Sequence, residues 1–332
     1  MGTNSSTRRL SDGRGDTRSV LSAAELALLA AEFGLGTDPV LTGERARGMQ
    51  GEIWRVRSTA GDWAVKELFL TEPEELAQVG AGLQEAAARA GVSVPLVVRT
   101  RAGDVLQRLG GRQVRVYSWV DLLPPDPLLD PARVGELLAT LHRVAPPASG
   151  PVHPWYTDPV GEVAWVELLH RLARAGNPLT EQLAAGHDDR IALERLLTPP
   201  TGLRLLHLDL WADNVRATPE GRLSVIDWDN SGAGEPTREL ALLLYEYCST
   251  DPRRATALHV AYVAAGGPGR VRRPEDFGTV AAQLGHILQL QGEAWVTAAS
   301  ASARDRAQAG LQEFVDRPLS GQVIDELLTA VG

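Results

Sequence analysis

The chain has 332 residues, of which 44 % are hydrophobic and 23 % charged, an ordinary globular composition in a chain long enough for two lobes with separate cores. Its formal net charge of −9 argues against a general nucleic-acid-binding protein, because there is no excess of Lys and Arg to neutralise phosphates. The single cysteine, Cys248, excludes an intramolecular disulfide, and no apolar run is long enough to span a bilayer. We therefore expect a cytoplasmic protein without a membrane partner.

The first residues are predicted to form a disordered tail, because positions 1–19 are polar and rich in Gly, Ser and Arg. Their start, Met1 to Ser6, fits the loose pattern for N-myristoylation, but such undemanding positions match easily by chance. A helix is expected over 23–33, where Ser22 and Glu25 have the spacing of a capping box.

Residues 20–121 are predicted to form a small lobe, a sheet with one long helix. The helix is expected over 72–90, which is rich in Ala, Leu, Glu and Gln, with Gly91 ending it. Alternating or short apolar runs bounded by turn residues predict strands at 53–56, 63–66, 95–100, 105–109 and 114–120.

A proline-rich segment, Pro124 to Pro127, is the best candidate for a linker. Residues 122–332 are then predicted to form a mainly helical lobe. Helices are expected at 131–143, 160–175, 188–197, 237–248, 254–265, 274–299 and 320–331. The exception is a strand-and-loop stretch at 205–236.

That stretch carries most of the chemistry. A first apolar run leads to a loop with the spacing H-x-D-x-x-x-x-N, from His207 through Asp209 to Asn214. A second apolar run ends on Asp227. Beside Mg-bound triphosphate, an Asp can accept a hydroxyl proton, while Asn and Asp oxygens suit the hard magnesium ion. The pattern predicts Asp209 as catalytic base and Asn214 and Asp227 as metal ligands in phosphoryl transfer from ATP.

Each of these residues has a plainer interpretation, since Asp and Asn often close turns and strands. Their joint order is rare by chance, which favours the functional interpretation. For His207 we favour the plainer one, a histidine that holds loop carbonyls and the Asp227 region in place.

A lysine at the end of a predicted strand, Lys66, is the third element. Such a lysine can reach the α- and β-phosphates when a helix glutamate steadies it. Glu75 of the 72–90 helix is the predicted partner, with Glu74 and Glu85 as alternatives. The glycines around 43–51 do not form G-x-G-x-x-G and give only weak support for a phosphate-covering loop.

These residues, in this order, resemble the aminoglycoside phosphotransferase and choline-kinase-like branch of the protein kinase fold. The strong motif is HLDLWADN at 207–214 followed by VIDWD at 225–229, and the moderate motif is the Ala-Val-Lys ending at Lys66. The resemblance covers about 41–265. It implies an α+β, bilobal fold: a small N-terminal lobe with an antiparallel sheet and one long helix, a larger helical C-terminal lobe, and ATP and Mg²⁺ between them.

The resemblance also implies a hinge. The carbonyl of Ser118 and the amide of Val120 would meet adenine, with Tyr117 at the back of the pocket. This chain departs from the family at Leu208, where glycine is usual, so the space beside the base can differ. Asp209, Asn214 and Asp227 are all retained, which argues against a catalytically dead member.

In this family the acceptor binds to the C-terminal lobe, often through carboxylates when it is a polyamine. The candidates are Asp213, Asp229, Glu235, Glu239 and Glu246. Each can equally be an ordinary carboxylate on a helix face. We expect a small hydroxylated acceptor such as an aminoglycoside or amino sugar, with choline-like or other hydroxylated amines as the alternative. Oligomeric state is not predicted.

Two competing classes remain open. A metal-dependent phosphohydrolase could use His207, Asp209, Asp227 and Asp229 around two metals, although such sites usually need more His or Asp ligands. A non-catalytic nucleotide-binding module would keep the fold without the chemistry.

Overall fold

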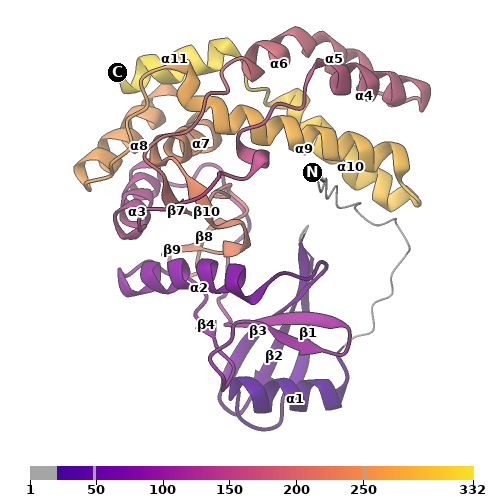
Figure 1. Ribbon diagram of the computed structural model, residues 1–332, viewed down its shortest axis with the longest axis vertical. Coiled ribbons are helices and arrows are strands. Elements are labelled where there is room, and N and C mark those ends of the chain that lie inside the picture. The colour runs from indigo at the N-terminus through magenta and orange to yellow at the C-terminus, as the bar shows by residue number, and fades with distance from the viewer. Residues whose placement is uncertain (1–20, 48–49, 250) are drawn as a thin grey trace, which may run out of the picture.

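The computed structural model describes residues 21–47, 50–249 and 251–332. A sheet and two helices occupy one end of the molecule, and the remaining helices form the other end (Figure 1). The α+β class expected from the sequence is therefore confirmed. The predicted tail and myristoylation pattern lie outside the described residues, and the boundary at 121/122 stays a prediction.

The small lobe is built on an antiparallel sheet in the order β1-β2-β3-β6-β4, with β5 also paired to β6. The strands are β1 (Val40–Arg47), β2 (Gly51–Ser58), β3 (Gly61–Leu68), β4 (Val97–Val98), β5 (Gln107–Leu109) and β6 (Arg112–Ser118). Helix α1 (Ala23–Phe33) begins at the predicted capping box, in which both Ser22–Glu25 hydrogen bonds are present. Its buried face packs with Trp54, Val65 and Val116 of the sheet.

The other face of this sheet carries the polar residues. Lys66 of β3 lies opposite Arg115 of β6, and Ala64 opposite Tyr117. Because side chains alternate along a strand, and Val65 and Val116 pack with α1, these residues must point away from α1. The alternation thus delivers Lys66, Arg115 and Tyr117 to a single face.

The second helix of this lobe, α2 (Glu74–Arg89), packs against the 205–236 stretch. Gly80 makes this possible, since a Cβ at that position would lie 3.0 Å from the carbonyl oxygen of Trp228. Just beyond Gly91, which has a φ of 87°, the carbonyl of Ser93 accepts the N–H of Val225 at 2.9 Å. The small lobe is therefore fixed directly to the segment that ends on Asp227.

The rest of the chain is mainly helical. The elements are α3 (Pro131–Val144), η1 (Pro154–Tyr156), α4 (Glu162–Arg174), α5 (Thr180–Ala185), α6 (His187–Glu194), α7 (Pro236–Cys248), α8 (Pro252–Ala264), η3 (Pro274–Phe277), α9 (Gly278–Thr297), α10 (Ala301–Asp316) and α11 (Gly321–Val331). Two short antiparallel pairs lie among them, β7 (Arg204–Leu206) with β10 (Gly232–Gly234) and β8 (Val215–Ala217) with β9 (Leu223–Val225). A short helix, η2 (Trp228–Asn230), follows Asp227.

Several elements differ from the sequence-based expectation. The predicted 274–299 helix is divided into η3 and α9, and α5, α10 and β10 were not predicted. Helix α10 was missed because only Ala307 and Leu311 are buried along it, which leaves little apolar periodicity to detect.

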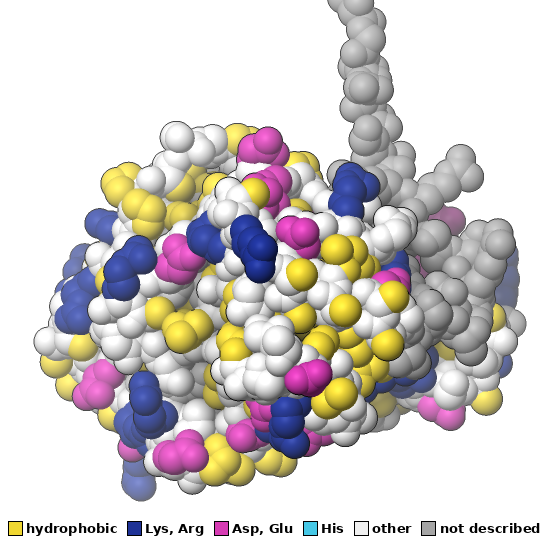
Figure 2. Space-filling model, turned by 90° about the horizontal axis from the view of Figure 1, so that it is seen from below, with side chains coloured by type: hydrophobic (Ala, Val, Ile, Leu, Met, Phe, Trp, Pro, Cys, Tyr) yellow, Lys and Arg dark blue, Asp and Glu magenta, His cyan; other side chains and the backbone are white. Residues whose placement is uncertain are grey.

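The surface carries mixed charge where the view from below shows it. Lys and Arg are interspersed there with Asp and Glu rather than gathered in one basic patch (Figure 2). Among the helices of the described part of the chain, none combines the length and apolar character needed to cross a membrane.

Candidate active site

The β8–β9 hairpin brings two predicted metal ligands to one place. Val215 pairs with Val225, so Asn214 just before β8 and Asp227 just after β9 lie at the same end of the hairpin. The N–H of Ile226 donates to the carbonyl of Asn214 at 2.9 Å and closes this end. The residues predicted from spacing are thus brought together by local strand pairing.

Asp209 is held by two amides. Its Oδ2 accepts hydrogen bonds from Asn214 Nδ2 at 3.0 Å and from Asn230 Nδ2 at 2.9 Å. Its Oδ1 has no hydrogen-bond partner among the described residues. We call Asp209, Asn214 and Asn230 the base pocket.

The base pocket raises the pKa of Asp209 to about 6. Burial is the main cause and the neighbouring Asp227 carboxylate adds to it, while the Asn230 and Asn214 amides act in the opposite direction. A carboxyl group with a pKa nearer neutrality is a better proton acceptor than an ordinary aspartate.

His207 supports the loop, as predicted. Its Nδ1 accepts the N–H of Asp209 at 3.3 Å, so the ring proton must sit on Nε2, which lies 3.0 Å from the carbonyl of Ile226. Burial lowers the pKa of His207 and favours this neutral form. The ring therefore ties Asp209 to the strand that delivers Asp227.

Leu208 adopts a left-handed backbone with a φ of 64°, a conformation that leucine rarely takes. Its N–H donates to Glu239 Oε1 at 2.6 Å, and its carbonyl accepts from Gln283 Nε2 at 2.9 Å. The side chain packs against β10, where a Cβ on Gly234 would come 2.5 Å from Leu208 Cδ2. The absence of a side chain at Gly234 thus makes room for the side chain of Leu208.

Glu239 has a structural position, which corrects its assignment as an acceptor-binding residue. Its side chain is 2 % exposed, and Oε2 lies 2.8 Å from His142 Nε2 while Oε1 holds the N–H of Leu208. The acceptor cannot reach a carboxylate that is enclosed and doubly engaged in this way.

Lys66 lies between two carboxylates of the 205–236 stretch. Its Nζ is 2.6 Å from Asp227 Oδ1 and 2.8 Å from Asp229 Oδ2. The other oxygen of Asp229 lies 2.7 Å from Arg115 Nη1. We call Lys66, Arg115 and Asp229 the lysine cluster. Asp229 is 2 % exposed and enclosed between Lys66 and Arg115, which corrects its assignment as an acceptor-binding residue.

The predicted Lys66–Glu75 pair is not formed. Glu75 is exposed on α2, and the nearby Glu72 pairs with Arg115 instead. Of the alternatives, Glu74 accepts the N–H groups of Val105 and Leu106, and Glu85 pairs with Arg99. The carboxylates beside Lys66 come from the large lobe: Asp227 and Asp229 both contact Lys66, and Asp229 also contacts Arg115 on the neighbouring strand β6.

The lysine cluster keeps its members charged. Burial lowers the pKa of Lys66, but the carboxylates of Asp229 and Asp227 outweigh it and leave the pKa raised. Burial likewise opposes ionisation of Asp229, yet Lys66 and Arg115 hold its pKa below the ordinary value.

The oxygens left free at the hairpin end suit a hard cation. Asn214 Oδ1 and Asp227 Oδ2 accept no hydrogen bond or ion pair from a described residue, and the Asp227 side chain is 34 % exposed. Asp227 also has a left-handed backbone, with a φ of 59°. Carboxylate and amide oxygens are the protein ligands that Mg²⁺ accepts. The residues present therefore fit a magnesium ion, although no cluster of three or more His, Cys, Asp or Glu side chains that could hold a metal occurs within the described ranges.

The three predicted hinge residues lie at and just beyond the end of β6: Tyr117 and Ser118 are its last two residues, and Val120 lies two residues after it. Ser118 is tied to Leu96 by two hydrogen bonds, of 2.9 and 2.8 Å. Burial, followed by the charge of Asp229, raises the pKa of Tyr117 to about 12. Contact of Tyr117, Ser118 and Val120 with adenine stays a prediction.

The remaining acidic candidates differ in exposure. Glu235 accepts the N–H of Thr201 at 3.0 Å and pairs with Arg238, and Glu246 accepts the N–H of Ala212 at 3.1 Å. Asp213 is exposed. Of the five predicted acceptor-binding carboxylates, Asp213 is therefore the most exposed to solvent.

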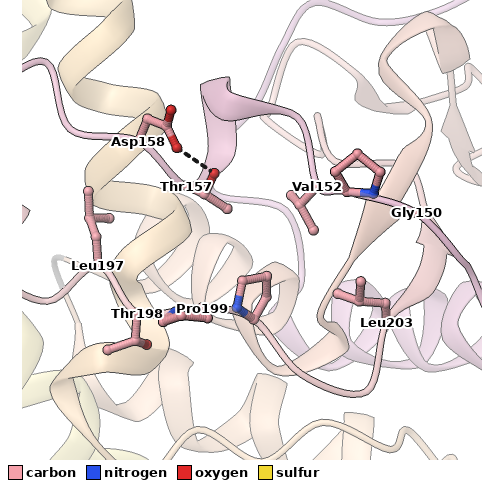
Figure 3. A pocket seen from close by; sticks show the side chains of 10 residues that line it. Gly150, Val152, Thr157, Asp158, Leu197, Thr198, Pro199 and Leu203 are labelled. Atoms are coloured by element: carbon pink, nitrogen blue, oxygen red, sulfur yellow. Dashed lines mark hydrogen bonds between the residues drawn. The ribbon is translucent and has the colours of Figure 1, made fainter.

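A hollow of about 450 Å³ opens elsewhere in the helical part, between η1 and the segment before β7 (Figure 3). Thr157 and Asp158 on one side are hydrogen-bonded to each other at 2.9 Å, and Pro199 and Leu203 line the other side. None of the residues of the base pocket or the lysine cluster lines this hollow.

Two site residues were missed from the sequence, Asn230 and Arg115. Asn230 directly follows the Asp-Trp-Asp run, so its position next to the motif could have identified it. Arg115 had no local signal, since only the pairing of β6 with β3 places it beside Lys66.

Known proteins share both the sequence pattern and the fold. The sequence pattern of a family described as the phosphotransferase enzyme family matches residues 44–275. The chain is 28 % identical over 230 residues to a homoserine kinase of Granulibacter bethesdensis, covering 67 % of this chain and 69 % of that protein. It is 32 % identical over 187 residues to a homoserine kinase of Pseudomonas aeruginosa, covering 52 % and 55 %.

Among solved structures, spectinomycin phosphotransferase in complex with ADP and spectinomycin is similar, with a TM-score of 0.65 and 13 % identity over 92 % of this chain and 97 % of that one. This likeness concerns the fold alone and confirms the expected protein-kinase-like architecture.

Proposed function

Because the chain belongs to the phosphotransferase enzyme family, we propose that it transfers the γ-phosphate of ATP, with Mg²⁺, to a hydroxyl group of a small acceptor. The observation that carries this proposal is the joint placement of two pairs at one end of the β8–β9 hairpin, Asp209 with Asn214 and Lys66 with Asp227. A phosphohydrolase with two metals is not favoured, because Asp229 is enclosed between two cations.

Each residue has one task in the proposed reaction. Oδ1 of Asp209 accepts the proton of the acceptor hydroxyl, while the acceptor oxygen attacks the γ-phosphorus and ADP leaves. Lys66 neutralises charge on the phosphates. Asn214 and Asp227 would hold Mg²⁺, which supplies charge neutralisation on the phosphate oxygens.

For the acceptor, we propose a small hydroxylated amino acid and place L-homoserine first. Relatives called homoserine kinases support this choice. The enclosed positions of Asp229 and Glu239 also weaken the case for a polycation, because the carboxylates that would bind several ammonium groups are engaged inside the protein. Aminoglycosides and choline-like amines remain the comparison substrates.

The test is a transfer assay with Mg²⁺ and radiolabelled γ-phosphate over L-homoserine, choline, 1-amino-2-propanol, spectinomycin and kanamycin, with products identified by mass. We expect a phosphate monoester of homoserine and no ester with Asp209→Asn. Efficient transfer to an aminoglycoside but not to homoserine would overturn the acceptor. Release of inorganic phosphate at equal rates with and without every acceptor would overturn the transferase.

A further inference from the structure

The side chain of Asn230 lies between the catalytic base and the loop that follows β1. Its Nδ2 donates to Asp209 Oδ2 at 2.9 Å, and its Oδ1 accepts from Gln50 Nε2 at 2.8 Å. The two contacts use opposite ends of one amide, so its orientation is defined: a flipped amide would set an oxygen against the carboxylate.

We infer that Asn230 is a positioning residue for the proton transfer, and this inference rests on the proposed function of Asp209. By holding Oδ2 from the side, Asn230 leaves Oδ1 as the oxygen that receives the hydroxyl proton. The proton moves from the acceptor oxygen to Oδ1 as the new O–P bond forms and the bond from the γ-phosphorus to ADP breaks.

Asn214 cannot do this alone, because its amide is shared. Its Nδ2 donates both to the backbone carbonyl of Asp209 at 2.9 Å and to Oδ2 at 3.0 Å. Its Oδ1 is the proposed magnesium ligand. Among the residues that the structure describes, Asn230 Nδ2 donates only to the Asp209 side chain, so it is the donor dedicated to the base.

The turn that carries Asn230 is anchored independently of Asp209. Ser231 Oγ donates to the carbonyl of Trp228 at 2.7 Å, and Trp228 Nε1 donates to the carbonyl of Val225 at 3.1 Å. Helix α2 packs on the same turn through Gly80. These contacts hold the amide in place whether or not the base is present.

The test compares substitutions at Asn230 with a matched change in the same turn. Asn230→Ala removes the donor, and we expect kcat to fall roughly 10- to 100-fold with the KM for Mg·ATP within about twofold, because the base loses its orientation. Asn230→Asp keeps the shape without the donor and should lose at least as much. Asn230→Gln keeps an amide donor on a longer side chain and should recover part of the loss.

Ser231→Ala is the control, since it weakens the turn without touching the base. We expect it to lower Tm while kcat stays within about threefold of the wild-type value. A loss of activity in Ser231→Ala as large as that in Asn230→Ala would assign Asn230 a merely structural role and overturn the inference.

A cycle with Asp209→Asn separates the inference from the proposed function. If Asn230 acts through Asp209, Asn230→Ala should cost no further activity in the Asp209→Asn background. An equal further loss there, a KM effect on Mg·ATP with unchanged kcat, or full activity of Asn230→Asp would overturn the inference. Full activity of Asp209→Asn itself would instead overturn the proposed function.

Discussion

The base pocket and the lysine cluster each enclose an aspartate, yet they shift its pKa in opposite directions. In the base pocket neutral amides face Asp209, and burial together with Asp227 raises its pKa to about 6. In the lysine cluster Lys66 and Arg115 face Asp229 and hold its pKa below the ordinary value in spite of burial. Neighbouring charge, rather than residue type, therefore separates the aspartate that can exchange a proton from the one that stays ionised.

The largest expected effect is at the base. Asp209→Asn should lower kcat by about 10²- to 10⁴-fold, because the acceptor hydroxyl loses its proton acceptor. Since the folded-state pKa of Asp209 is raised, its ionised form opposes folding above that pKa, and the neutral amide should make the protein more stable at pH 8, by roughly 1–2 kcal/mol. Steady-state kinetics and urea unfolding at pH 8 check both parts. Turnover within tenfold of wild type would remove Asp209 from the mechanism.

Asp229→Asn should act on stability with the opposite sign. It leaves Lys66 and Arg115 close together with less compensation, so we expect a loss of about 3–5 kcal/mol in the free energy of unfolding. Because the pKa of Asp229 is lowered, this deficit should be present at pH 7 and shrink as the pH falls below the ordinary aspartate range. Glu85→Gln, which breaks the partly exposed pair with Arg99, is the matched control and should change stability by under about 1 kcal/mol. An Asp229→Asn protein as stable as the wild type would show that Lys66 and Arg115 do not need the Asp229 carboxylate.

Substitutions at Leu208, next to the base pocket, should have a smaller effect on stability. Leu208→Ala should lose about 2–4 kcal/mol, because it opens a cavity facing Gly234. Leu208→Gly removes the same contacts but relieves the left-handed backbone, so it should be about 1 kcal/mol more stable than the alanine variant. Leu206 lies in β7 with an ordinary backbone, and there glycine should be worse than alanine. Thermal unfolding of the alanine and glycine variants at both positions measures this. If alanine is more stable than glycine at Leu208 as well as at Leu206, the backbone of Leu208 is not strained.

The smallest effect is on the pH dependence. Asp209 must be ionised to accept a proton, so kcat/KM for the acceptor should fall as the pH drops below about 6. Neutralisation of Asp227 by Mg²⁺ should move this limb to lower pH, since the Asp227 charge is one cause of the raised pKa. Profiles at low and saturating Mg·ATP measure the movement. A limb that moves to higher pH with saturating Mg·ATP would contradict this cause.

Two members of the base pocket, Asp209 and Asn214, could be predicted from the sequence because they are close along the chain, whereas Asn230 was missed. One hairpin, β8–β9, places Asn214 beside Asp227, and the loop before it supplies Asp209. The spacing of these residues along the chain was therefore enough to predict that they lie together. The supporting role of His207 was predicted from the same loop.

The lysine cluster could not be predicted in full, because its contacts join strands and lobes. Arg115 meets Lys66 only through the register of β6 with β3, and Asp229 reaches both across the lobe boundary. Glu239 was misassigned for a similar reason. Its spacing on α7 was visible, but its burial against His142 and Leu208 depends on distant segments.

The difference between the two aspartates is tested most directly by NMR titration of the protein labelled with ¹³C at aspartate carboxyl groups. We predict one carboxyl that titrates near pH 6, is absent in Asp209→Asn and persists in Asp229→Asn. A carboxyl near pH 6 that survives in Asp209→Asn, or no aspartate titrating above about pH 5 in the wild-type protein, would contradict the account.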